Sequence, residues 1–284
     1  MYKEPPPLVS GRAAPFLLTR IKRFFPMKYN HLLIAFLLGV CATLASCRSA
    51  QDMARVSDKT MDSSQFVNIT DVVPDAILEI RYFSTYNFVG ARVDGYEQPV
   101  ALLTRVAADS LRAVSDDLKR HGYCLKIYDA YRPQRAVDHF MRWALDTSDT
   151  LTKAYFYPRL TKEEVFEKEY VAKRSGHSRG STIDLTLVDM KLGKELDMGG
   201  TFDWFGIESH PDYGGGNPET LDFQQVYPTF TSEQFYNRMV LRSAMMRHGF
   251  KPLDNEWWHF TLKDEPFPDT YFNFPVTTLK GNQK

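Results

Sequence analysis

Two short polar clusters, far apart in the sequence, hold the side chains that could do chemistry. The first runs from Ser175 to Asp184 and contains His177, and the second is Glu256-Trp-Trp-His259. Zinc in hydrolases is usually held by three nitrogen or oxygen ligands, and a water occupies the fourth position. His177, Asp184 and His259 supply three such ligands. Glu256 is then left as a candidate general base, so the pattern indicates a catalytic zinc site.

The elements around the first cluster would bring its ligands together. Gly180 predicts a turn, and residues 183–187 alternate apolar and polar side chains as a half-buried strand does. His177, which precedes the turn, can therefore fold back beside Asp184. Taken alone, such a pair is more often a turn-capping aspartate and a solvated histidine. The second cluster, with its own carboxylate and imidazole beside two tryptophans, favours the metal site instead.

The two clusters, together with other segments in the same order, resemble the D-alanyl-D-alanine dipeptidases, a zinc dipeptidase branch of peptidase family M15. The resemblance extends from roughly residue 70 to residue 275. Besides the two clusters, the matching segments are Tyr82–Phe88, Val93–Tyr96, Tyr128–Val137, Met198–Asp203 and Asp264 through Pro275. This many ordered matches are hard to obtain by chance.

The resemblance implies a role for each reactive side chain. One zinc ion per chain would be bound by His177, Asp184 and His259. Glu256 would take a proton from the attacking water and deliver it to the leaving amine. Arg132 would stabilise the oxyanion, since a guanidinium stays charged and presents several donors where negative charge develops. The alternative for Arg132 is an ordinary ion pair at the surface.

The resemblance also implies how the substrate, D-alanyl-D-alanine, is recognised. Asp203 and Ser175 would hold its free amino terminus, and Tyr82 would close the pocket. A carboxylate that pairs with an ammonium group selects against an acylated amine, which has no charge. Each of these three side chains could instead have a structural role. One departure from the family pattern is Gly176, which stands where a serine is more usual.

The N-terminal segment carries targeting information. The apolar run of residues 31–47 is too short to span a bilayer comfortably and ends in Leu-Ala-Ser-Cys47. This form is typical of a signal peptide with a lipoprotein cleavage site, so we expect an exported, periplasmic or cell-surface enzyme anchored to the membrane by lipid on Cys47. Residues 1–26 are interpreted as a wrongly assigned start, with Met27 the natural one. The alternative is an uncleaved hydrophobic anchor.

Composition limits what remains of the chain. Residues 1–47 form the signal region, residues 48–65 a polar, flexible tether, and residues 66–284 a single catalytic domain. The 35 basic and 35 acidic residues balance, and no basic stripe appears, which argues against nucleic acid as a partner. Cys124 is the only cysteine beyond Cys47, so the mature chain can form no internal disulfide.

Periodicity predicts an α+β fold, in which helices flank a small, mostly antiparallel sheet that carries the zinc site at its face. Capping boxes at Thr161 and Thr231 predict the starts of two helices. Two further helices are expected at 102–120 and 133–145, and strands at 124–128, 183–187 and 257–262.

Three functions are compatible with these patterns. The first is hydrolysis of D-alanyl-D-alanine to two D-alanine molecules in cell-wall peptide turnover. The second is a D,D-carboxypeptidase that trims peptidoglycan stem peptides on the same zinc scaffold, and the third is a non-catalytic wall-binding lipoprotein. Glu256 and Arg132 argue against the third. Closure of the amine side of the cleft by Asp203 would separate the first function from the second.

Overall fold

A mixed, six-stranded sheet forms the centre of the computed structural model, which describes residues 59–280. Its strand order is β2-β4-β5-β8-β7, with β6 paired to β5. These strands are β2 (Ile77–Leu78), β4 (Tyr123–Asp129), β5 (Thr182–Asp189), β6 (Lys194–Glu195), β7 (Phe250–Pro252) and β8 (His259–Leu262). Only the pairing of β2 with β4 is parallel. The predicted small, mostly antiparallel sheet is therefore confirmed.

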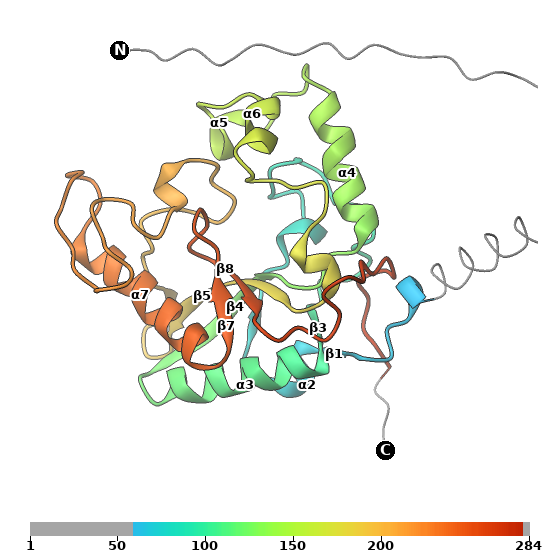
Figure 1. Ribbon diagram of the computed structural model, residues 1–284, viewed down its shortest axis with the longest axis horizontal. Helices are drawn as coiled ribbons and strands as arrows, with labels where there is room; N and C mark the ends of the chain where they lie inside the picture. The colour runs from blue at the N-terminus through green and yellow to red at the C-terminus, as the bar shows by residue number, and fades with distance from the viewer. Residues whose placement is uncertain (1–58, 281–284) are drawn as a thin grey trace, which may run out of the picture. The chain divides into compact units, whose positions relative to one another are not determined.

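Helices lie on both sides of this sheet (Figure 1). In the view of Figure 1, α2 and α3 lie below the strands, α7 lies to their left, and α4, α5 and α6 lie above them. Their bounds are α2 (Ile69–Val72), α3 (Arg105–Lys119), α4 (Gln134–Leu145), α5 (Lys153–Phe156), α6 (Lys162–Glu167) and α7 (Ser232–Arg247). Within residues 59–280 no helix is both long and apolar enough to cross a membrane. The predicted α+β class is confirmed.

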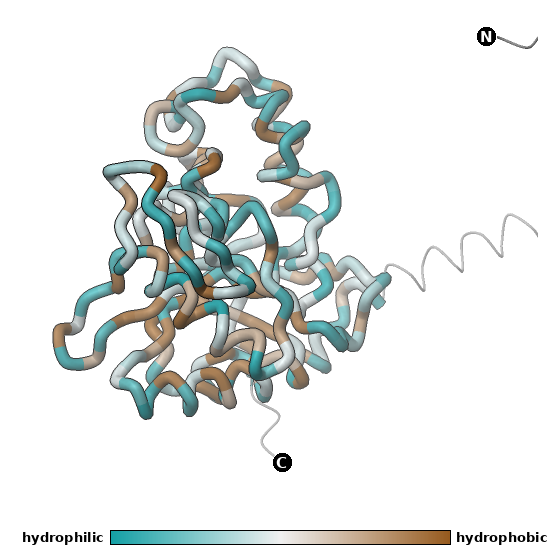
Figure 2. The backbone as a smooth tube through the Cα atoms, turned by 60° about the vertical axis from the view of Figure 1, so that its left-hand side comes forward, coloured by the Kyte–Doolittle hydropathy of each residue, from teal (hydrophilic) through white to brown (hydrophobic). Residues whose placement is uncertain are grey.

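The helix expected at 102–120 begins later than its sequence pattern indicated. Leu102–Thr104 forms β3, which pairs in antiparallel fashion with β1 (Phe66–Asn68), and α3 begins only at Arg105. The local pattern continued the helix into these residues, but pairing with a distant segment removes them from it. In Figure 2 this helix, at the bottom of the view, alternates between apolar and polar residues.

The other helix starts follow their local signals closely. Thr161 and Thr231 each form a complete capping box, because the side chain accepts from the third helical residue and that residue's side chain accepts in return. Pro133 is the N-cap of α4, which starts one residue later than predicted. The strand expected from Trp257 begins instead at His259. Local capping chemistry therefore fixed helix starts more accurately than alternation fixed strand starts.

A continuous hydrophobic core holds the central strands in place. Leu125 and Ile127 of β4 and Leu185 and Leu187 of β5 are fully buried. They belong to the same apolar cluster as residues of α3 such as Leu111. Because every second residue of β5 is anchored in this core, the residues between them are directed to the opposite face of the sheet. Asp184 is one of those residues, so the core fixes the position of its carboxylate.

A candidate metal centre in a catalytic cleft

Three candidate metal ligands converge where β5 and β8 pair. Asp184 lies opposite His259 in the strand register, and His177 belongs to the short 3-10 helix η2 (Gly176–Arg179) that precedes β5. His177 Nε2 lies 3.1 Å from Asp184 Oδ2 and 3.2 Å from His259 Nδ1. His259 Nδ1 lies 3.0 Å from Asp184 Oδ1. One donor atom from each of the three residues therefore lies within 4.8 Å of the other two.

The turn at Gly180 brings His177 back beside β5. Gly180 has a φ of 81°, in the left-handed region, and a Cβ there would approach the ring of Phe66 to 2.3 Å. Glycine is therefore required on both conformational and steric grounds. At the other end of η2, Ser175 Oγ accepts a hydrogen bond from the His177 backbone N–H at 3.2 Å. The two ends of this segment fix where the imidazole points.

The donor set is suited to a single divalent metal ion. His177 Nδ1 donates to the carbonyl oxygen of Ala130 at 2.7 Å, which leaves Nε2 with a free lone pair for a metal. Asp184 Oδ1 is buried and accepts no hydrogen bond. Donors bound tetrahedrally at zinc distances are about 3.3 Å apart, close to the separations of these atoms. Within residues 59–280 this is the one group of at least three such side chains close enough to hold an ion.

Glu256 lies beside the three donors but is not one of them. Its Oε2 is 3.5 Å from His259 Nδ1, and 8 % of the residue is exposed. Burial, together with the negative charges of Asp184 and Asp203, raises the pKa of Glu256 well above its ordinary value. A carboxylate with a raised pKa is a better proton acceptor near neutral pH. The structure therefore places a buried carboxylate with a raised pKa next to the candidate metal donors.

Arg132 reaches the cleft from the segment that connects β4 to α4. Its Nε donates to Asp129 Oδ2 at 2.9 Å, and its Nη2 lies 3.5 Å from Asp184 Oδ2. The guanidinium carbon is 4.8 Å from the centre of the Tyr82 ring. The guanidinium therefore contacts two buried carboxylates and an aromatic ring inside the cleft. The alternative of an ordinary ion pair at the surface does not apply.

Asp203 and Tyr82 form a second polar pair in the cleft. Tyr82 Oη donates to the Asp203 carboxylate at 3.0 Å and 3.2 Å. Burial raises the pKa of Asp203 to about 7, so the group is close to its titration midpoint at neutral pH. Asp203 also has a φ of 62°, a left-handed conformation that aspartate and asparagine tolerate better than most residues. An ammonium group beside this carboxylate would favour its charged form.

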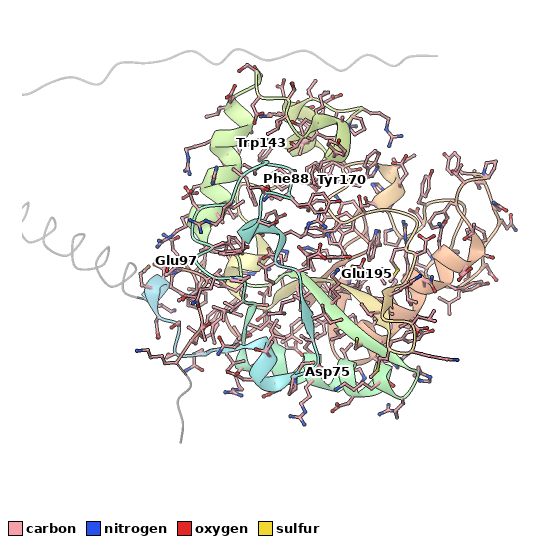
Figure 3. The ribbon with its side chains drawn as sticks, turned by 180° about the vertical axis from the view of Figure 1, so that it is seen from behind. Asp75, Phe88, Glu97, Trp143, Tyr170 and Glu195 are labelled. Carbon is pink, nitrogen blue, oxygen red and sulfur yellow. The ribbon has the colours of Figure 1, made fainter. Side chains whose placement is uncertain are left out.

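All eight residues that the sequence singled out line one cleft of about 740 Å³, namely Tyr82, Arg132, Ser175, His177, Asp184, Asp203, Glu256 and His259. Phe88 and Tyr170, which are labelled in Figure 3, belong to its apolar wall. Both rings pack against Phe205. The structure therefore brings together the predicted ligands, the predicted base and the predicted substrate-binding side chains.

One buried residue beside the cleft was missed by the sequence analysis. Asp129, the last residue of β4, is 1 % exposed and is bonded to Arg132. The spacing of three residues between Asp129 and Arg132 was the available signal, but such pairs are common on protein surfaces. Only the structure shows that this pair is buried next to the metal ligands.

Comparisons with known proteins agree with the site geometry. The family model for peptidase M15, D-Ala-D-Ala dipeptidase, matches residues 62–277. The chain is 40% identical over 213 residues to a D-alanyl-D-alanine dipeptidase of Enterococcus faecalis, which covers 75% of this chain and 98% of the relative. It is 38% identical to the Streptomyces coelicolor protein of the same name over 75% and 99% of the two chains. It is 31% identical to the Escherichia coli protein of that name, over 71% of this chain and 86% of the relative.

A family match over most of the chain, relatives covered almost end to end and a buried His-Asp-His donor set all point the same way. The chain therefore belongs to the M15 family of D-Ala-D-Ala dipeptidases and is a metallopeptidase.

Proposed function

We propose that this protein is a zinc-dependent dipeptidase that hydrolyses D-alanyl-D-alanine to two D-alanine molecules. The observation that carries the proposal is the arrangement within one cleft of three candidate metal donors and two further buried carboxylates, Glu256 and Asp203. Relatives covered almost end to end are named for the same substrate.

Zinc is the metal that this donor set suits best. Two imidazoles and one carboxylate form a typical catalytic zinc set, which leaves a coordination position for water or substrate. Bound zinc would acidify a water molecule and polarise the peptide carbonyl. The donors His177, Asp184 and His259 account for one ion per chain. The remaining chemistry falls to neighbouring side chains.

Glu256 and Arg132 supply the proton transfer and the charge stabilisation. Glu256 accepts a proton from the attacking water, and its raised pKa favours holding that proton until the leaving amine takes it. Arg132 Nη2 lies 3.5 Å from Asp184 Oδ2, next to the metal donors. From there it can donate to the carbonyl oxygen of the substrate, which becomes negative as water attacks the peptide bond. Both side chains line the cleft in which the metal donors lie.

Asp203, Tyr82 and Ser175 recognise the free amino terminus of the dipeptide. Tyr82 donates a hydrogen bond to the Asp203 carboxylate and so orients it. A carboxylate can accept several hydrogen bonds, so Asp203 can also accept one from an ammonium group. Ser175 lines the same cleft and adds a hydroxyl. An acylated substrate nitrogen would leave Asp203 buried without a counterion, which is unfavourable.

The Asp203 role predicts discrimination between free and acylated substrates. Wild-type protein should release D-alanine from D-alanyl-D-alanine and leave N-acetyl-D-alanyl-D-alanine almost intact. Asp203→Asn should lower kcat/KM for the free dipeptide by about 100-fold, the effect of losing a charged hydrogen-bond partner. Asparagine is the matched replacement because it tolerates the left-handed backbone. Equal cleavage of the acetylated compound by wild type would instead indicate a D,D-carboxypeptidase.

The place of action in the cell is a separate part of the proposal. We infer from the apolar run ending at Cys47 that the enzyme is exported and anchored by lipid, and that it acts in cell-wall peptide turnover. Cys47 lies outside the described residues, so the argument rests on sequence alone. Labelling of cells with a tagged fatty acid should mark the wild-type chain and leave Cys47→Ser unmarked. Absence of the label from the wild-type chain would refute the lipid anchor.

A further inference from the structure

Asp129 is a buried carboxylate that touches the catalytic machinery without touching the cleft. It is 1 % exposed and is absent from the residues that line the cleft. In the strand register it lies opposite Asp184, which in turn lies opposite His259, so these three residues form a row across β4, β5 and β8. A residue in this place can influence catalysis only through its neighbours.

Both oxygens of the Asp129 carboxylate have a specific donor. Oδ1 accepts from Tyr96 Oη at 2.6 Å, and Oδ2 accepts from Arg132 Nε at 2.9 Å. Tyr96 is itself 2 % exposed, and its backbone pairs with Val276 near the end of the described chain. Because a buried charge is costly unless fully bonded, these contacts together define one orientation of the carboxylate.

The orientation of Asp129 determines how Arg132 presents its guanidinium. The bond to Nε fixes the guanidinium plane, and the rings of Tyr82 and Phe140 lie 4.8 Å and 5.3 Å from the guanidinium carbon. The two terminal nitrogens then remain for the cleft. Without Asp129 the nearest buried carboxylate is Asp184, which Arg132 Nη2 already approaches to 3.5 Å. A tighter pair with Asp184 would draw the guanidinium away from substrate.

We propose that Asp129, braced by Tyr96, is a positioning residue that holds Arg132 in its catalytic orientation and keeps it from pairing fully with Asp184. The inference rests on the proposed role of Arg132 in stabilising the transition state. It predicts that loss of Asp129 mainly lowers kcat, because the oxygen that Arg132 stabilises carries its charge only in the transition state.

A double-mutant cycle tests this proposal. Asp129→Asn should lower kcat by about 10- to 100-fold with little change in KM, the range expected for a lost charge-assisted hydrogen bond. Tyr96→Phe should act in the same direction with a smaller effect. In an Arg132→Met background, Asp129→Asn should cause no further loss beyond about 2-fold. Losses that multiply in the double variant would overturn the proposal.

A measurement of metal affinity distinguishes the positioning of Arg132 by Asp129 from a second role, in which Asp129 orients the metal ligand His177. Asp129 Oδ2 also lies 3.7 Å from His177 Nδ1, so it could instead orient a metal ligand. Zinc affinity of Asp129→Asn should equal that of wild type, and a marked fall would overturn the proposal. Tyr96→Phe removes a single hydroxyl and can carry the cycle if Asp129→Asn does not fold. The cycle works with any dipeptide that wild type cleaves, so failure of the proposed substrate would be seen separately.

Discussion

Replacement of Glu256 by glutamine is expected to lower kcat by ~10²- to 10⁴-fold, the usual contribution of a general base. Glutamine keeps the size of the side chain but cannot accept the proton of the attacking water. The raised pKa of Glu256, which follows from burial and from the nearby charges of Asp184 and Asp203, is lost with the carboxyl group. Steady-state release of D-alanine from D-alanyl-D-alanine measures the effect, and KM should change much less than kcat.

Metal content is the control for this variant. Glu256 is not one of the three converging donors, so the glutamine variant should bind zinc with the same stoichiometry as wild type. Its stability should not fall, since the replacement removes a carboxylate whose burial costs free energy. Full activity of this variant would contradict the assignment of the base. Loss of the metal together with activity would place Glu256 among the ligands instead.

Replacement of Asp184 by alanine is expected to abolish metal binding and to reduce kcat/KM by on the order of 10³-fold or more. Asp184 is the only anionic donor of the set and contacts both histidines. Its removal leaves only the two histidine donors, one fewer than the three protein ligands of a catalytic zinc site. Measurements of bound zinc and of D-alanine release on the same sample test both parts of the expectation.

Asp189 provides a matched comparison for the Asp184 variant. It lies at the far end of the same strand, β5, and its carboxylate caps a turn by accepting from the backbone of Lys191 and Leu192. Asp189→Ala should therefore retain zinc and activity, even if its stability falls by about 1 kcal/mol. If both variants lost zinc equally, disruption of the strand rather than loss of a ligand would explain the result.

The sequence predicted the metal donors because their positions follow from local chemistry. A histidine, a glycine turn and an aspartate on an alternating strand place His177 beside Asp184 without reference to the rest of the chain. The approach of His259 is different, since it depends on the antiparallel pairing of β5 with β8. The sequence analysis grouped His259 with the other two donors from the chemistry of the two clusters and from the family resemblance, and it did not predict the strand pairing itself.

Features set by contacts between distant segments could not be predicted from the sequence. Pairing with Phe66–Asn68 made Leu102–Thr104 a strand where helical periodicity continued through it. The Tyr82–Asp203 bond and the burial of Asp129 likewise arise from segments that meet only in the folded chain. An acidic residue is most often solvated, and a three-residue spacing to an arginine is common on protein surfaces, so the sequence alone does not distinguish Asp129 from exposed acidic residues.

The central claim is that one metal ion, held by His177, Asp184 and His259, enables this cleft to hydrolyse D-alanyl-D-alanine. The most direct measurement is a titration of zinc into metal-free protein while the release of D-alanine is followed. We expect negligible activity without metal and a linear rise to a plateau at one zinc ion per chain. Substantial activity of the metal-free protein, or no D-alanine release at any zinc concentration, would contradict the account.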